Sequence, residues 1–246
     1  MTQTTADVVR ALLAEDPSFH GGGQRSWAVD TRLVHWLAEH VPAGGRTLET
    51  GSGHSTVAFL TRSGAHVVVT PFGDEVGRIR AWCAAHDVDT GALVLEEGPS
   101  QRVLPRLVDD GPLDVVLIDG DHAFPAPAID WYYTAERVRV GGHVLVDDTQ
   151  LRPCRLLRDF LAEEPGWEQL PPVGRTAVFR RTSPAPVTAA AWFDQPWSAL
   201  GPYAVGGEPL AERVQLLRVQ LRLRTRLRRA LARRHDASPS ARNERR

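Results

Sequence analysis

Four aspartates stand directly after two apolar segments of the sequence. Asp119 and Asp121 follow the first segment, with His122 beside them, and Asp147 and Asp148 follow the second. Carboxylates held close together repel one another, so neighbouring strand ends collect them only with compensation. A divalent cation provides that compensation, and hard carboxylate oxygens suit Mg²⁺. The imidazole of His122 has an ordinary pKa suited to proton abstraction. From these residues alone, a role as helix caps stays open as the alternative.

A glycine-rich turn, Glu49–Thr56, follows another apolar segment and opens a predicted helix. Gly51 and Gly53 allow a tight turn and a close approach of the backbone to a ligand. Thr56 stands where a dinucleotide-binding fingerprint has its third glycine, which disfavours a pyrophosphate cofactor. An acid ahead of G-x-G suits a ligand with a positive ammonium group instead.

The composition excludes several kinds of chemistry. All 29 basic residues are arginines, so no lysine is present to serve a P-loop, a Schiff base or proton abstraction. Cys83 and Cys154 have no metal-binding spacing and are expected to be ordinary reduced thiols. Residues 1–14 lack the basic-then-apolar pattern of a secretion signal. No apolar run reaches the roughly 18 to 20 residues that span a bilayer.

Apolar strands alternate with helical segments over most of the chain. We expect parallel strands at residues 47–49, 66–70, 92–96, 113–118 and 143–146, and an antiparallel closing pair at 167–170 and 176–181. This alternation predicts a mostly parallel sheet with helices on both faces, which binds ligands at the carboxyl ends of its strands. The glycine turn and both aspartate pairs therefore fall on one edge of the sheet.

Three motifs then occur in order: E-x-G-x-G-x-S-T, I-D-G-D-H and G-G-x-x-x-x-D-D. Together they resemble the class I S-adenosylmethionine-dependent methyltransferases, especially the small-molecule and sugar O-methyltransferases, over residues 27–182. The resemblance implies a Rossmann-like α/β sandwich with a mostly parallel seven-stranded sheet and an antiparallel last strand. The positions it implies for binding S-adenosylmethionine are Glu49, Gly51, Gly53, Ser55, Thr56, Gly98, Ser100 and Asp119. It also implies that Asp119, Asp147 and Asp148 bind Mg²⁺, and that Asp121 or His122 abstracts a proton from the acceptor.

The sequence departs from this family at the end of the second strand. Members usually have an acid there, which accepts hydrogen bonds from both ribose hydroxyls of the cofactor. Here the strand ends in Thr70, Pro71 and Phe72. We expect Asp74 to cap a helix running to His86 rather than to replace the missing acid. Because a charge-assisted hydrogen bond contributes about 1.5 to 3 kcal/mol, its loss predicts weaker cofactor binding.

Four segments make up the predicted domain organisation. Residues 1–26 form a helix and loop, 27–182 the methyltransferase-like domain, 183–209 an irregular linker, and 210–246 an arginine-rich helix with a disordered end. From residue 211 onward, twelve arginines face only three acids, although the whole chain has a net charge of −1. Three interpretations of this basic helix stay open. It packs on its own acidic body or on a twin subunit, it contacts a membrane surface or a partner protein, or it binds nucleic acid. Nucleic acid is disfavoured, because no aromatic side chain interleaves the arginines.

These observations predict a cytoplasmic, metal-assisted O-methyltransferase that acts on a hydroxyl of a small molecule such as a sugar or secondary metabolite. The first alternative is a binding or scaffold protein that kept the fold and lost efficient methyl transfer. The second is an NAD-type enzyme on a similar sheet, which Thr56 and the missing ribose acid disfavour. Phe124, Trp131, Tyr132 and Tyr133 are expected either to line an acceptor pocket or to pack in the core.

Overall fold

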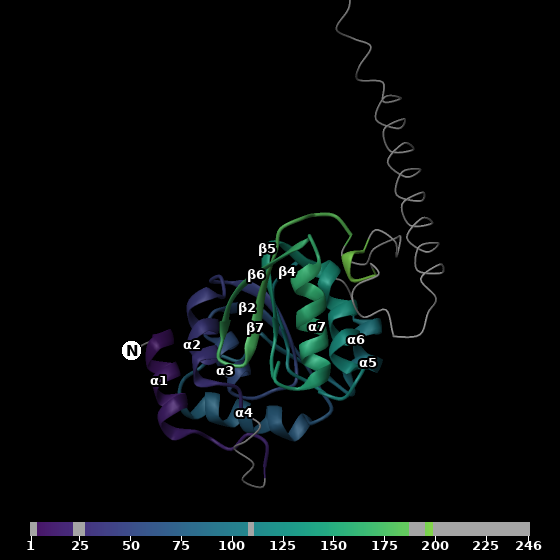
Figure 1. Cartoon of the computed structure of the whole chain (residues 1–246). Helices are drawn as coiled ribbons and strands as arrows, with labels where there is room; N and C mark the ends of the chain where they lie inside the picture. The colour runs from purple at the N-terminus through teal and green to yellow at the C-terminus, as the bar shows by residue number, and fades with distance from the viewer. Residues whose placement is uncertain (1–3, 22–27, 108–110, 187–194, 199–246) are drawn as a thin grey trace, which may run out of the picture. The chain divides into compact units, whose positions relative to one another are not determined.

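Seven strands form one sheet in the computed structural model, which describes residues 4–21, 28–107, 111–186 and 195–198 (Figure 1). The strands are β1 Gly45–Thr50, β2 Ser63–Thr70, β3 Leu93–Glu97, β4 Leu113–Ile118, β5 Val138–Val146, β6 Trp167–Val173 and β7 Thr176–Arg181. Their spatial order is β3-β2-β1-β4-β5-β7-β6. The first five pair in parallel, whereas β7 lies antiparallel between β5 and β6. The predicted fold class is confirmed.

Helices cover both faces of this sheet and form the two outer layers of a sandwich (Figure 1). One face is covered by α1 Thr5–Glu15, α2 Thr31–His40, α3 His54–Leu60 and α4 Gly73–Ala85. The other is covered by α5 Ser100–Val103, α6 Ala126–Thr134 and α7 Arg152–Glu163, with the short 3₁₀ helices Leu104–Arg106 and Ala135–Arg137. A third 3₁₀ helix spans Pro196–Ser198.

Strand β4 shows why the sheet is covered on both sides. Its residues alternate between the two cores: Val115 and Leu117 pack in one, and Val116 and Ile118 in the other. A strand buried on both faces reads as a continuous apolar run, which is typical of parallel sheets. This explains why the pattern of β4 in the sequence has no polar alternation.

The carboxyl ends of the central strands are in register. Thr50 of β1 pairs with Ile118 of β4, and Ile118 in turn pairs with Val146 of β5. The chain reverses its strand order between β1 and β4, which is where such sheets open a crevice for ligands. The loops that follow these three strands therefore meet at one edge of the sheet, as predicted.

The start of α4 differs from the sequence prediction. The helix begins at Gly73 with Phe72 as its N-cap residue, so the prediction of Asp74 as the cap is wrong. Asp74 lies one residue inside the first turn and is exposed. The connection from β2 to α4 is short, since β2 ends at Thr70 and α4 begins at Gly73. The helix therefore starts before Asp74, the residue whose capping preference suggested a later start.

The chain divides into two units, residues 1–188 and 189–246. The first contains the whole sheet and all seven α-helices described above. The predicted arginine-rich helix at 210–246 lies outside the described residues, as does most of the predicted linker at 183–209. Within the part of the chain that the structure describes, we find no helix of the length and apolar character required to cross a membrane.

Candidate functional site

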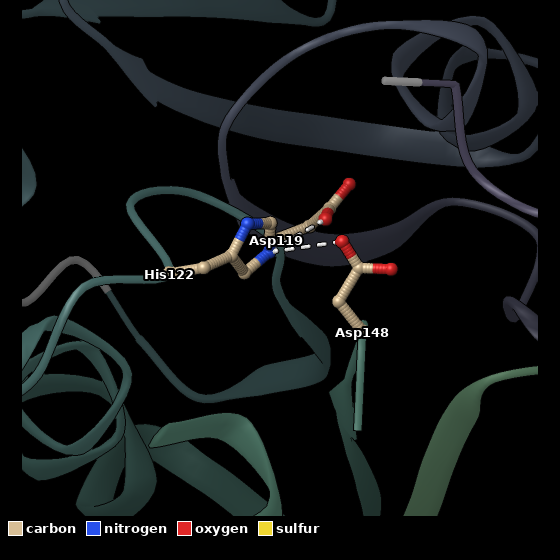
Figure 2. A group of neighbouring side chains, drawn as sticks. All are labelled: Asp119, His122 and Asp148. Atoms are coloured by element: carbon tan, nitrogen blue, oxygen red, sulfur yellow. Dashed lines mark ion pairs between the residues drawn. The ribbon is translucent and has the colours of Figure 1, made fainter. Parts of the chain in front are cut away.

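Three side chains from two loops converge beyond the ends of β4 and β5. His122 Nε2 lies 3.4 Å from Asp119 Oδ1 and 3.7 Å from Asp148 Oδ2 (Figure 2). One candidate ligand atom from each residue lies within 4.8 Å of the other two, which is close enough for all three to contact one cation. We call Asp119, His122 and Asp148 the acid–histidine cluster.

Burial and mutual charge shift the pKa values in this cluster. Desolvation raises the pKa of Asp119 to about 7, and the negative charges of Asp147 and Asp148 act in the same direction, whereas the close contact with His122 opposes the rise. The pKa of His122 is raised chiefly by its close contact with Asp119, against the effect of burial. The carboxyl and the imidazole therefore titrate as a coupled pair. A cation at this position would relieve the repulsion between the carboxylates.

Backbone geometry separates the two adjacent aspartates. Asp147 continues the line of β5, since its N–H donates to the carbonyl of Ile118, 3.0 Å away. Its side chain is fully buried and accepts a 2.6 Å hydrogen bond from the Thr176 hydroxyl. Asp148 has a left-handed backbone with φ +52°, a conformation that aspartate tolerates better than most residues. With this backbone the Asp148 carboxylate reaches the acid–histidine cluster, and Arg175 Nε holds its Oδ1 at 2.6 Å while lying 3.9 Å from Asp147 Oδ2.

The structure thus brings together two of the three predicted metal ligands, Asp119 and Asp148. The third, Asp147, lies outside the acid–histidine cluster and has a structural partner in β7. His122, predicted as a proton acceptor, takes the third position. Asp121, the other predicted proton acceptor, is exposed, and its Oδ1 accepts a 2.8 Å hydrogen bond from the N–H of Ala123.

The glycine turn after β1 lies against the loop that carries Asp119. Gly51 has φ +89°, and an added Cβ would overlap the carbonyl oxygen of Asp119 and lie 3.0 Å from its carbonyl carbon. Glycine is therefore required at this point both by the backbone conformation and by the close approach. Gly53 lies under His20, whose Nε2 would be 3.4 Å from an added Cβ.

Glu49 holds this turn from inside the protein. Its carboxylate is fully buried and accepts hydrogen bonds from the Ser55 hydroxyl, at 2.6 Å, and from the Thr56 hydroxyl. His66 Nε2 lies 3.1 Å from the same carboxylate, and the N–H of Gly53 donates to Thr56 Oγ1 at 3.0 Å. Among the described residues, this set forms an interior network beneath the turn rather than a surface facing a ligand.

A cavity of about 720 Å³ opens beside the turn and the acid–histidine cluster. Its lining includes five of the predicted site positions besides Asp148, namely Gly51, Ser100, Asp119, Asp121 and His122. The other predicted cofactor positions are not among its lining residues in the described part of the chain; these are Glu49, Gly53, Ser55, Thr56 and Gly98.

Two titratable residues that line this cavity, His20 and Glu75, were not predicted from the sequence. Glu75 lies in the first turn of α4, is 5% exposed, and accepts a 2.9 Å hydrogen bond from the Ser52 hydroxyl. Its other oxygen lies 3.2 Å from His20 Nδ1. The helical periodicity of the buried residues Val76 and Ile79 was the available signal, because it places position 75 on the inner side of α4.

Of the four aromatic residues that follow the cluster, one is buried and three, including Tyr133, are exposed. Trp131 is buried and contacts Phe160 edge-on, with ring centroids 5.0 Å apart. Phe124 and Tyr132 are exposed, and neither is among the residues that line the cavity. Phe72 is the aromatic residue that does line it.

Residues 48–149 match the family described as "Methyltransferase domain". Cofactor-bound Rv0187 from MTB has a similar structure, with a TM-score of 0.55 and 22% identity over 71% of this chain and 89% of that one. The O-methyltransferase TomG from Streptomyces achromogenes, in complex with SAM, has a TM-score of 0.51 and 17% identity over 73% of this chain and 89% of that one. SAH-bound methyltransferase PaMTH1 from Podospora anserina has a TM-score of 0.51 and 16% identity over 73% of this chain and 96% of that one. No curated protein sequence matches the chain.

Proposed function

We propose that this chain, which has a methyltransferase-like fold and whose residues 48–149 match a methyltransferase domain family, transfers the methyl group of S-adenosylmethionine to a hydroxyl of a small molecule with the help of a divalent cation. The observation that carries the proposal is a single cavity of about 720 Å³ that contains both the Gly51 turn and the acid–histidine cluster. Its volume falls in the usual range of ligand pockets, about 300 to 1,000 Å³.

The cavity offers matched surfaces for the methyl donor. Gly51 and Ser52 present the turn to which the amino-acid end of the donor would bind. Phe72 lines the same cavity from the connection after β2, and Ser100 and Gln101 line it from the start of α5. These residues would hold the adenine by stacking and by polar contacts. The TomG and PaMTH1 structures, which carry SAM and SAH, support this choice of ligand.

The acid–histidine cluster fits a divalent cation. Asp119 and Asp148 supply carboxylate oxygens, and His122 supplies an imidazole nitrogen if it is neutral. Two oxygens suit Mg²⁺ or Mn²⁺, and the nitrogen widens the choice toward Mn²⁺ and related ions. A bound cation would lower the pKa of an acceptor hydroxyl next to the donor. Asp147 keeps its structural role in this proposal.

The residues of the chain then supply alignment and proton transfer. Methyl transfer breaks the C–S bond of the sulfonium as the new C–O bond forms, so most of the acceleration comes from holding the two reactants in line. His122 can accept the hydroxyl proton only where Asp119 and Asp148 alone would hold the cation and the imidazole is free of metal. Asp121 is the second candidate, although its hydrogen bond to Ala123 occupies part of its accepting capacity.

A second function, binding without efficient methyl transfer, is favoured by one feature. The strand β2 ends at Thr70 and is followed by Pro71, without the acid that the family resemblance predicts. In that case the protein would hold the donor weakly or serve as a scaffold. For either function we keep as proposals a small-molecule acceptor, a cytoplasmic location, an assembly of two or more copies, and a membrane or protein partner for the arginine-rich segment.

Calorimetric titration with S-adenosylhomocysteine, with and without Mn²⁺ or Mg²⁺, tests the proposal. We expect micromolar binding, followed by metal-dependent methylation in a screen of hydroxylated acceptors. Asp148→Asn should abolish the increase in methylation that the metal causes. Glu163→Gln, which changes an exposed carboxylate on α7, should leave that increase unchanged. No binding up to millimolar product would refute methyl transfer and favour the scaffold.

A further inference from the structure

The carboxylate that β2 lacks has a counterpart on the neighbouring helix. Between Val68 and Gly73 the chain contains no acidic residue, so the end of β2 offers no carboxylate to accept hydrogen bonds from a ribose. Glu75 follows within the first turn of α4 and lines the cavity at 5% exposure. Burial of a carboxylate is costly unless its oxygens have partners, so this side chain is held there by specific contacts.

Those contacts orient the Glu75 carboxylate and use only part of its capacity to accept hydrogen bonds. Ser52 donates to Oε2 at 2.9 Å, and His20 Nδ1 lies 3.2 Å from Oε1. A carboxylate has about four lone-pair positions, so each oxygen keeps one for a further donor. Two free acceptor positions side by side match the two neighbouring hydroxyls of a ribose.

The surroundings of Glu75 match a nucleoside rather than an ammonium group alone. Thr70, Pro71 and Phe72 line the cavity on the same strand-to-helix connection, and Pro99 lines it from the loop after β3. These residues provide an apolar surface for a flat base. The acid–histidine cluster belongs to the loops after β4 and β5 instead. A base against Phe72 would place its sugar next to the carboxylate.

We propose that Glu75 binds the ribose hydroxyls of the methyl donor and replaces, from α4, the acid expected at the end of β2. Ser52 and His20 act as positioning residues for its carboxylate. This inference rests on the proposed function, because it takes the donor to be an adenosine derivative. It also explains how a chain with Pro71 after β2 retains a complete cofactor site.

Calorimetry with two probes tests the role of Glu75: S-adenosylhomocysteine and its 2′-deoxy analogue. We expect Glu75→Gln to bind S-adenosylhomocysteine about 10- to 100-fold more weakly than the wild type, the range of one charge-assisted hydrogen bond. Asp74→Asn is the matched control, since it makes the same charge change one residue away on the exposed side of α4, and it should bind normally.

The deoxy analogue identifies the group that Glu75 contacts. It should bind the wild type several-fold more weakly than the parent compound, and Glu75→Gln should lose this discrimination. Equal discrimination in both proteins would overturn the inference, and so would equal binding of both probes by the wild type. If Glu75→Gln does not fold, Ser52→Ala serves instead, and it should reduce the discrimination by freeing the carboxylate. If the wild type binds neither probe, the proposed function itself fails, which is a different outcome from normal binding without ribose discrimination.

Discussion

Replacing Gly51 with alanine perturbs the contact between the glycine turn and the loop that carries Asp119. The residue has φ +89°, where a side chain costs about 1 to 2 kcal/mol of folding free energy. The added Cβ would also overlap the carbonyl oxygen of Asp119, and backbone atoms cannot rotate away as a flexible side chain can. Overpacking of this kind costs about 1 to 3 kcal/mol. We therefore expect Gly51→Ala to lose roughly 2 to 5 kcal/mol of stability.

Gly44→Ala provides the matched control. Gly44 also has a positive φ, +73°, but an added Cβ there would meet nothing within 4 Å. Its cost should be the backbone contribution alone, about 1 to 2 kcal/mol. The difference between the two variants isolates the close approach of the β1 and β4 loops.

Thermal unfolding and calorimetric binding of S-adenosylhomocysteine measure the two consequences. For a domain of this size, each kcal/mol lowers the unfolding temperature by about 2 to 4 °C, so Gly51→Ala should unfold clearly below Gly44→Ala. It should also bind the product more weakly, because the Asp119 loop must shift. Equal unfolding temperatures for the two variants would show that the turn and the loop are not in contact. The described packing of the glycine turn against the Asp119 loop would then be wrong.

Three further predictions follow from burial and charge. Asp147→Ala should lose about 1 to 3 kcal/mol of stability because the Thr176 hydroxyl is left unpaired, and it should retain its affinity for Mn²⁺. Asp148→Asn should weaken Mn²⁺ binding in calorimetry with little change in unfolding temperature. The reverse pattern would restore Asp147 as the ligand. Burial lowers the pKa of His143, so the stability contributed by its neutral form is present above its ordinary pKa of 6.5 and is lost as the pH falls. His143→Asn should therefore flatten the fall in unfolding temperature between about pH 7.5 and 5.5, and an unchanged slope would refute this. Burial raises the pKa of Cys83 to about 11 and of Cys154 to about 12, so a thiol reagent should label both cysteines only after unfolding, and rapid labelling of the native protein would contradict their burial.

The parts of the site that depend on strand ends could be predicted from the sequence. Asp119, His122 and Asp148 were identified because each follows an apolar strand, and parallel strands bring their carboxyl ends together. The separation of Asp147 from Asp148 could not be predicted, because it depends on a single left-handed residue. No residue preference in the sequence fixes that conformation.

Side-chain direction on helices and in turns limited the remaining predictions. Glu75 and Asp74 are adjacent acids, and only the rotation of α4 decides which one reaches the cavity. The periodicity of Val76 and Ile79 indicates this rotation, but placing the helix cap at Asp74 instead of Phe72 shifted the predicted start of the helix. Glu49 shows the same limit, since its buried hydrogen bonds with Ser55 and Thr56 depend on how the turn folds.

The interior network beneath the glycine turn has a consequence for the thermodynamics of ligand capture. Because Glu49, Ser55 and Thr56 are bonded to one another below the turn, the loop is ordered when the protein folds, before any ligand arrives. The conformational entropy of the turn is then lost during folding and not again on association. Binding at this end of the cavity should consequently show fast association and little reorganisation, and the loops on the far side of the cavity can diverge in sequence without disturbing the turn.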